Sequence, residues 1–292
     1  MSGGKSLYLP LAGLAGLIVM GSVADGTRGW TKVTRQRISA TYFHFFLSTL
    51  VWSGTAFACW KFGMVPNSPM APMGVGILGM FLIYRLQTLD YNADRFKKIL
   101  TFYSFAALQG SLLSVLLLKS FEMGLFDVVT QAAVLTSAVV ASVSAIVAAS
   151  PGLNFMWLGG ILGTGLGLLV GANLINMLWS SSTVMHMGIS YFGAALFSLM
   201  LLYDTAKVVK EASVPPGSAP RARMAGGVAA EFDPIKHALQ LYLDMVNLFL
   251  YLVRIMMQQR MQEERSSNRQ SGGGGNGVPV PQLRPSAPPL RP

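Results

Sequence analysis

Long apolar windows recur along the chain, all but the last of them without a charged residue, and short polar stretches separate them. A helix needs about 20 apolar residues to cross the hydrocarbon core of a bilayer, so each window predicts a membrane-spanning helix. The windows are residues 7–23, 42–60, 64–84, 99–118, 128–150, 153–179, 184–203 and 235–257. The pattern therefore predicts an all-α, polytopic membrane bundle.

Local signals refine the starts of two of these helices. Three prolines lie at the beginning of the third window, so we expect its helix to start near Met70. The last window follows Asp233 and Pro234. An acidic N-cap followed by proline at the first helical position is a favourable helix start.

The first window has a second interpretation. Residues 7–20 have the length of a signal-peptide core, and Lys5 precedes them. The sequence Val23-Ala24-Asp25 is a poor cleavage site, which favours a retained helix. The start of the chain shows no clear pattern of a mitochondrial transit peptide.

The polar stretches divide the chain into three expected parts. Residues 1–32 should form an N-terminal transmembrane helix and linker. Residues 33–262 should form the membrane core, with a long loop at residues 205–233 that is rich in Pro, Gly and Ala. Residues 263–292 are rich in Gly and Pro, and we expect them to be disordered or extended.

Composition narrows the class of function. Hydrophobic residues make up 52% of the chain and charged residues 12%, whereas a soluble domain carries about 25% charged residues. An ordinary soluble enzyme is therefore excluded. The single cysteine, Cys59, excludes a disulfide framework and a cysteine-based metal site. Because no nucleophile–base pair is evident, we predict that the protein is not an enzyme and needs no cofactor.

The net charge of +10 is distributed unevenly along the chain. In an alternating topology, most of the basic residues outside the tail fall on one side of the membrane. They are Arg28, Lys32, Arg35, Arg37, Arg85, Arg95, Lys97, Lys98, Lys207, Lys210, Arg221, Arg223 and Lys236. This side should face the cytoplasm, or the matrix of a mitochondrion. The charge favours contact with anionic lipids such as cardiolipin rather than with nucleic acid, since it flanks spans.

The last window carries a polar face on an otherwise apolar helix. Its members recur at heptad spacing and are His237, Gln240, Asp244, Asn247, Tyr251, Arg254 and Gln258. Lipid does not satisfy polar groups, so this face must point at protein or water. We therefore expect the other helices to enclose this helix, or the helix to line a cavity.

A second carboxylate, Asp204, follows the window at residues 184–203. A charge at the centre of a span costs about 2.5–3.5 kcal/mol, which makes Asp204 and Asp244 candidates for function. Two buried carboxylates close together cannot both ionise at low cost, and the pair can share a proton. Such a pair suits a proton-linked gate or a cation site, and calcium prefers oxygen ligands of this kind.

Other interpretations of these residues stay open. Asp204 fits a wetted position at a helix end equally well. Asp244 also fits a structural ion pair with Arg254 or Arg85. Arg85 itself follows an apolar stretch and suits a side chain that snorkels to the membrane surface.

Several motifs resemble the Bax inhibitor-1 (TMBIM) family. They are Leu202-Tyr203-Asp204-Thr205-x-Lys207-Val208, Phe232-Asp233-Pro234-Ile235 and Leu241-Tyr242-Leu243-Asp244-x-x-Asn247-Leu248-Phe249. The sequence Arg37-Ile38-x-x-Thr41-Tyr42 and the extra N-terminal helix are similar to the mitochondrial, growth-hormone-inducible branch of that family. The resemblance covers residues 33–257 and is most specific in the last two helices.

The resemblance implies a seven-helix core whose last helix is surrounded by the other six, with one further N-terminal helix here. It implies a calcium leak channel or calcium/proton exchanger of the mitochondrial inner membrane. The carboxylate pair of that family would map to Asp204 and Asp244, and a latch arginine would correspond to Arg85. The remaining residues that we expect to support the site are His237, Gln240, Asn247 and Arg254.

A second class of function also fits the sequence. The chain would then be a non-transporting accessory or scaffold subunit of a larger inner-membrane complex, or a crista-organising protein, with its tail as a contact to other subunits. Small residues recur at every fourth position in two successive helices, as packing seams do. They are Ala133, Ser137, Ala141, Ala145 and Ala149, and then Gly159, Gly163, Gly167 and Gly171. One arrangement pairs the two seams with each other.

Overall fold

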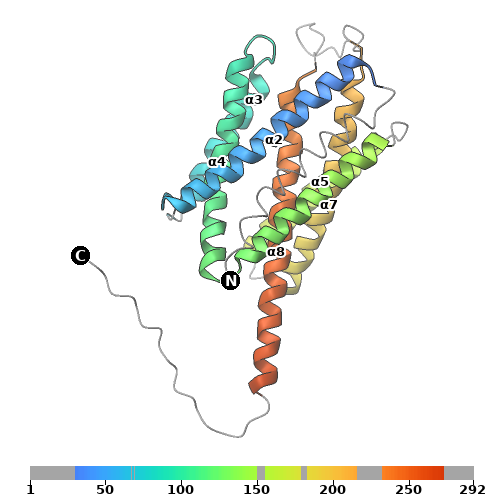
Figure 1. Ribbon diagram of the computed structural model, residues 1–292. Helices are drawn as coiled ribbons and strands as arrows, with labels where there is room; N and C mark the ends of the chain where they lie inside the picture. Colours follow the sequence, from blue (N-terminus) through green and yellow to red (C-terminus); the bar gives the residue numbers. More distant parts are fainter. Residues whose placement is uncertain are drawn as a thin grey trace, which may run out of the picture. The chain divides into compact units, whose positions relative to one another are not determined.

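The computed structural model describes residues 30–66, 68, 70–149, 155–178, 183–215 and 232–272. Within these ranges the chain forms seven α-helices and one 3-10 turn, and no strand. They are α2 (Lys32–Lys61), α3 (Ala71–Thr88), α4 (Arg95–Glu122), α5 (Phe126–Ala149), η1 (Phe155–Trp157), α6 (Leu158–Leu178), α7 (Thr183–Ala212) and α8 (Pro234–Gly272). The all-α class is confirmed (Figure 1). The helix expected at residues 7–23 and the tail after residue 272 lie outside the described residues.

Five of the described helices are long and apolar enough to cross a membrane. They are α4, α5, α6 with the turn before it, α7 and α8. The expected spans at residues 42–60 and 64–84 also form helices, α2 and α3, but these two are less apolar. Basic residues occupy the start of α2, and α3 is short, with 18 residues and Arg85 near its end. The fold is that of a polytopic membrane protein.

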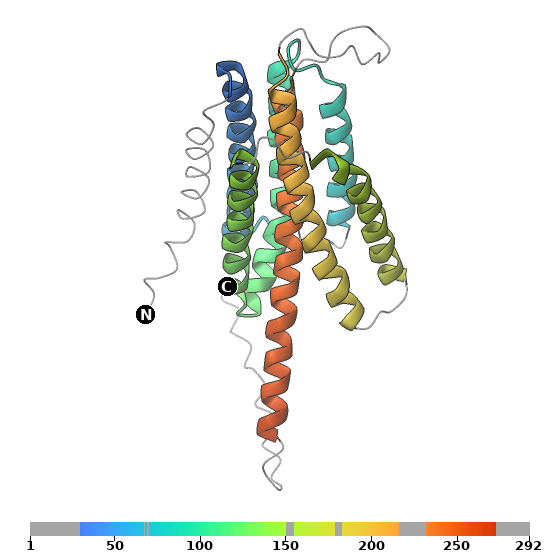
Figure 2. The same cartoon turned by 90° about the vertical axis from the view of Figure 1, so that its right-hand side faces the viewer.

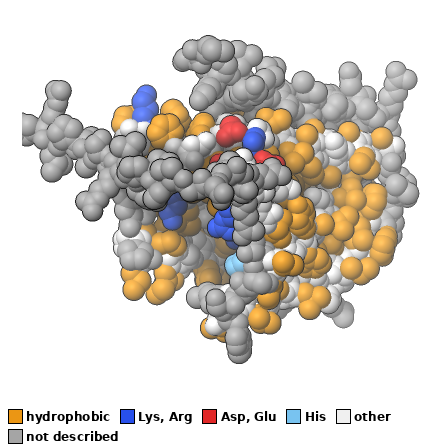
Figure 3. Space-filling view, turned by 90° about the horizontal axis from the view of Figure 1, so that it is seen from below, with side chains coloured by type: hydrophobic (Ala, Val, Ile, Leu, Met, Phe, Trp, Pro, Cys, Tyr) orange, Lys and Arg blue, Asp and Glu red, His pale blue; other side chains and the backbone are white. Residues whose placement is uncertain are grey.

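Large apolar side chains on the outer faces of the helices fit this class. Leu168 and Leu174 of α6 are exposed, as are Met80 and Phe81 of α3. Figure 3 shows hydrophobic side chains over much of the described surface in one view. Such faces suit contact with lipid tails, because no water has to be ordered around them there.

Several predicted boundaries are wrong. The helix expected to end at Tyr203 continues to Ala212, so Asp204 lies inside α7 and the loop expected at residues 205–233 starts later. A charge ends an apolar window but not a helix, and here Val208 and Ala212 continue the buried face of α7. Similarly, α8 runs to Gly272 instead of ending before residue 263, because its polar end is rich in good helix formers.

The chain divides into two compact units, Met1–Met257 and Gln258–Pro292, and the boundary falls within α8. The first unit holds α2 to α7 and the beginning of α8. The described part of the second unit is the polar end of α8, where Arg260 and Glu263 form an ion pair of 3.9 Å.

The first part of α8 runs through the middle of the bundle (Figures 1 and 2). In its most apolar stretch 50% of the residues are buried, against at most 33% in the other four candidate spans. The ring of Tyr242 is fully buried and meets the rings of Trp52, Phe102 and Phe105 edge-on, at centroid distances of 6.5, 6.1 and 6.1 Å. The prediction that the other helices enclose the last helix is confirmed.

The arrangement that pairs the two small-residue seams is wrong. Of the described helices, α6 packs against α7, whereas α5 packs against α7 and α4. A Cβ on Gly165 would lie 2.8 Å from Leu196 of α7, but Gly163, Gly167 and Gly171 have open space around them. The buried leucines of α6, Leu162 and Leu169, set its orientation, because only large apolar side chains gain much from burial.

One end of the bundle joins the starts of α2, α4 and α8 to the end of α7, and we call it the basic end. Lys98 Nζ forms an ion pair with Asp233 Oδ2 at 2.6 Å and donates to the Leu89 carbonyl at 2.7 Å. Asp233 Oδ1 also accepts from the backbone N–H groups of Ile235 and Lys236, at 3.0 and 3.1 Å. The predicted N-cap is confirmed, and it anchors the start of α8 to α4.

A second contact at the basic end ties α2 to α7. Arg37 Nη1 donates to the carbonyl oxygens of Ala212 and Val214, at 3.2 and 2.7 Å. Its guanidinium also lies over the ring of Phe232, 5.5 Å from the centroid. These contacts satisfy carbonyl groups that the end of α7 leaves without an intrahelical partner.

Candidate functional site

Asp204 of α7 and Asp244 of α8 face each other inside the bundle. Their exposed fractions are 8% and 3%. The two carboxyl groups lie close enough to share a hydrogen bond when one of them carries a proton. The structure therefore brings together the two carboxylates that the sequence singled out, and Asp204 is not a wetted residue at a helix end.

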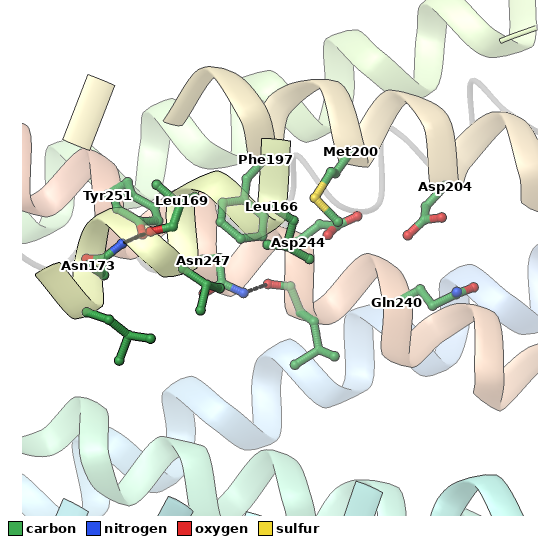
Figure 4. A pocket seen from close by; sticks show the side chains of 13 residues that line it. Leu166, Leu169, Asn173, Phe197, Met200, Asp204, Gln240, Asp244, Asn247 and Tyr251 are labelled. Carbon is green, nitrogen blue, oxygen red and sulfur yellow. Dashed lines mark hydrogen bonds between the residues drawn. The ribbon is translucent and has the colours of Figure 1, made fainter. Parts of the chain in front are cut away.

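The pair opens into a cavity of about 580 Å³ between α6, α7 and α8. Most of its lining is apolar, and the polar residues that line it are Asp204, Gln240, Asp244, Asn247, Asn173 and Tyr251. Figure 4 shows Asp204 and Gln240 at one end of the cavity and Asn173 with Tyr251 at the other. The cavity therefore holds its two acidic groups among largely apolar side chains.

The polar face of α8 supplies four of these residues, because positions 240, 244, 247 and 251 lie on one side of a helix. Asn247 Nδ2 donates to the Leu243 carbonyl at 2.8 Å, and Asn173 Nδ2 donates to the Leu169 carbonyl at 2.8 Å. An amide that uses its N–H groups in this way keeps its oxygen as an acceptor. The two asparagines therefore offer neutral oxygen ligands within the same cavity as the acidic pair.

Tyr251 closes the other end of the cavity. Its hydroxyl accepts from Asn173 Nδ2 at 3.3 Å, and its ring stacks on Phe197 with centroids 5.8 Å apart. Gly193 of α7 makes room for this ring, since a Cβ there would lie 2.7 Å from it.

Five buried polar atoms on α8 have no hydrogen-bond partner among the described residues, and they are His237 Nδ1, Gln240 Oε1, Tyr242 Oη, Asp244 Oδ2 and Gln258 Oε1. Three of them, on His237, Gln240 and Asp244, follow one another at spacings of three and four residues. Buried polar atoms are almost always paired in proteins, with water or an ion where no protein group is available. These atoms are therefore available to bind water or an ion inside the bundle.

The other predicted residues lie apart from the carboxyl pair. Arg254 is exposed, with its guanidinium 5.4 Å from the centre of the Tyr251 ring, and Arg85 is exposed on α3. Neither arginine lines the cavity. Between the described side chains, Asp244 forms no ion pair with either of them.

His237 is buried, with 2% of its side chain exposed, and its Nε2 lies 3.1 Å from Oε2 of Glu211. The sequence reasoning missed Glu211, although Glu211 follows Asp204 by seven residues and so lies on the same face of α7. It also missed Asn173, an amide within the apolar window that became α6. The signal for Glu211 was its helical spacing from Asp204. The signal for Asn173 was its position as a polar residue inside an apolar stretch.

Comparison with known proteins supports the resemblance to the Bax inhibitor-1 family that the sequence motifs indicated. Residues 34–261 match the protein family described as inhibitor of apoptosis-promoting Bax1. The chain is 27% identical over 237 residues to growth hormone-inducible transmembrane protein of Rattus norvegicus, which covers 76% of this chain and 62% of that protein. It is 28% identical over 105 residues to Bax inhibitor 1 of Oryza sativa, covering 36% of each chain. With a BI1-like protein of Arabidopsis thaliana it shares 33% identity over 136 residues, 45% of each chain. The chain thus spans less than two thirds of the length of these relatives.

Proposed function

The chain belongs to the Bax inhibitor-1 family, and from this premise we propose that it is a calcium/proton channel or exchanger controlled by the Asp204–Asp244 pair. The observation that carries the proposal is the position of this pair. Two buried carboxyl groups from different helices meet at the end of a cavity whose other polar groups are amides and a tyrosine hydroxyl.

The chemistry of the cavity suits a cation in transit. Calcium takes carboxylate and amide oxygens as ligands, and the number of charged ligands sets how tightly it binds. Asp204 and Asp244 supply two carboxylates, and the amide oxygens of Gln240 and Asn247 add neutral ligands beside them. Two acidic groups with neutral partners fit weak, exchangeable binding, which transport requires.

The same pair couples the cation to protons. Carboxylates this close repel each other when both are charged, and either a shared proton or a bound cation relieves that repulsion. Protons and calcium therefore compete for one place, so acidification should weaken calcium binding. The pair joins α7 to α8. Binding of a proton or a cation to it therefore also changes the contacts that hold α8 in position.

The test is calcium flux in proteoliposomes made with the full chain. We expect Asp244→Asn and Asp204→Asn each to lower the flux about tenfold or more and to remove its dependence on pH, since each loses a charged ligand. The matched control is Asp94→Asn, which removes a carboxylate from a surface ion pair of 2.8 Å with Lys97. If Asp244→Asn carries calcium as the wild type does, the carboxyl pair is not the gate.

The proposal includes the mitochondrial inner membrane as the location. Its support is the similarity to the growth-hormone-inducible branch of the family. Import into isolated mitochondria, followed by protease treatment after the outer membrane is opened, tests this location. Recovery of the protein in another membrane would contradict it.

A second candidate function is that of an accessory subunit in a larger membrane complex. The observation that favours it is the polar end of α8, which is helical and carries the exposed residues Met261, Glu263 and Glu264. Purification in mild detergent separates the two functions. A stable, stoichiometric partner complex together with the absence of calcium flux would favour the accessory role.

A further inference from the structure

Glu211 of α7 and His237 of α8 form a second contact between the two helices that carry the carboxyl pair. Glu211 lies seven residues after Asp204 on α7, and His237 lies seven residues before Asp244 on α8. Because α7 and α8 run in opposite directions, each pair bridges the two helices. Seven residues of helix span about 10 Å, so the Glu211–His237 contact lies two turns closer to the basic end.

The two members of this contact differ in their access to water. The side chain of Glu211 is 46% exposed, whereas that of His237 is 2% exposed. His237 Nε2 and Glu211 Oε2 are 3.1 Å apart. The other face of the contact is closed by Phe232, whose ring stacks on the imidazole with centroids 5.0 Å apart. Among the described residues, Glu211 is the exposed polar side chain in contact with this buried imidazole.

On its inner side the imidazole begins the line of unpaired atoms on α8. In the part of the chain that the structure describes, His237 Nδ1, Gln240 Oε1 and Asp244 Oδ2 have no hydrogen-bond partner, and they lie on one face of the helix. Gln240 also lines the cavity beside Asp204. Water bound to these atoms would link the imidazole to the acidic pair, because buried polar atoms without protein partners hold water.

The charges around this contact come from three helices. On α7, Asp204 and Lys207 lie near it, and on α8 Lys236 does. From α2, Arg37 contacts the face of Phe232 and so flanks the stack from outside. The contact thus has cations at its outer rim and the acidic pair on its inner side, which favours movement of a positive charge inward.

We propose that Glu211 and His237 form the proton port through which the Asp204–Asp244 pair exchanges protons with the water at the basic end. Glu211 takes a proton from water and donates it to His237 Nε2. The imidazolium then releases its other proton from Nδ1 toward the line of atoms that leads to Asp244. The ring is left neutral with its proton on Nε2, and the same steps in reverse return a proton to the outside.

This inference rests on the proposed function, since it supplies the proton that competes with calcium there. Its test needs no calcium. In the full chain in lipid nanodiscs, a rapid acidification is followed by time-resolved infrared absorption of the protonated carboxyl group. The absorption band that is missing in Asp244→Asn belongs to the carboxyl pair. The measured quantity is the rate at which this band appears after acidification.

We expect Glu211→Gln and His237→Gln to slow the appearance of this band about a hundredfold or more, since a positioned proton-transfer group contributes about 10²–10⁴-fold. Asp94→Asn, at the same end of the bundle, should leave the rate unchanged. In Glu211→Ala, added formate should restore the rate, because a small acid can occupy the space of the missing carboxyl group.

Two outcomes would overturn the port. The first is an unchanged rate in both Glu211→Gln and His237→Gln, which would mean that protons reach the pair by way of the cavity. The second is a slowed rate in Glu211→Ala that formate does not restore, which would mean a purely structural contact. A wild-type chain with the expected infrared rates but no calcium flux would instead contradict the proposed function and leave the port standing.

Discussion

At the scale of single residues, the surroundings of Asp244 determine what it can bind. Gln240 lies one turn before it and Asn247 one turn after it on the same face of α8, and all three line the cavity. Gln240 Oε1 lacks a partner among the described residues, and Asn247 uses its Nδ2 group on the backbone. Both amide oxygens are therefore available beside a buried carboxylate.

This arrangement predicts that Gln240→Met and Asn247→Leu weaken calcium binding while largely keeping the side-chain volume. A neutral hydrogen-bond or ligand contact contributes about 0.5–1.5 kcal/mol, so each change should lower the affinity about two- to tenfold. Binding to the purified protein is measured by titration calorimetry. Gln87→Met, at an exposed position of α3, is the control, and an equal affinity in all three variants would remove the amides from the site.

At the scale of helices, close backbone approach holds the bundle together around α8. α2 packs along α4, and at Gly110 a Cβ would overlap the Trp52 carbonyl oxygen and lie 3.0 Å from Thr55 Cβ. Trp52 in turn contacts Tyr242 and Phe249 of α8, with ring centroids 6.5 and 5.4 Å apart. Gly110 therefore positions the aromatic side chain that covers one side of the central helix.

We expect Gly110→Ala to destabilise the protein, because a backbone carbonyl cannot turn aside as a flexible side chain can. Overpacking of this kind costs about 1–3 kcal/mol. Gly54→Ala on α2 is the matched control, since a Cβ there meets nothing within 4 Å, and it should be neutral or gain up to about 1 kcal/mol of helix propensity. Thermal denaturation in detergent compares the two variants. Equal midpoint temperatures would contradict this prediction, because they would mean that α2 and α4 can move apart without cost.

At the scale of the whole molecule, the basic residues gather at the end where the helices are tied together. Lys98 is buried against Asp233, and Arg37 covers the last carbonyl groups of α7. The proposed proton port lies at this same end. The positive charge from which we predicted the orientation in the membrane thus also surrounds the start of the central helix.

The alternating topology can be tested on α4. This helix has 28 residues, which corresponds to about 42 Å and exceeds a hydrocarbon core of about 30 Å. In a Cys59→Ser background, Asp90→Cys and Glu122→Cys place single thiols at exposed positions before and at the end of α4. An impermeant maleimide should label them from opposite sides of sealed vesicles. Labelling of both from one side would mean that α4 does not cross the membrane.

The class of the protein, the presence of the described helices and the inward-facing side of α8 could all be predicted from the sequence. In a bilayer the backbone must satisfy its own hydrogen bonds, so an apolar stretch of sufficient length specifies a helix. A polar residue in such a helix must also face protein or water, which is why the spacing from His237 to Tyr251 predicted that the other helices enclose α8 or that α8 lines a cavity. The acidic Asp233 before Pro234 predicted the start of that helix for an equally local reason.

Which residues of different helices contact each other could not be predicted and emerged from the packed bundle. Asp204 looked like the end of a helix because its charge ended an apolar window, yet Val208 and Ala212 extend the packed face of α7 beyond it. The small-residue seams looked like partners, yet the leucines of α6 orient that helix toward α7. The contact of Glu211 with His237 likewise depends on how α7 and α8 are rotated and set against each other. Rotation and crossing of helices follow from the packing of all their side chains at once, and the periodicity of one helix does not encode them.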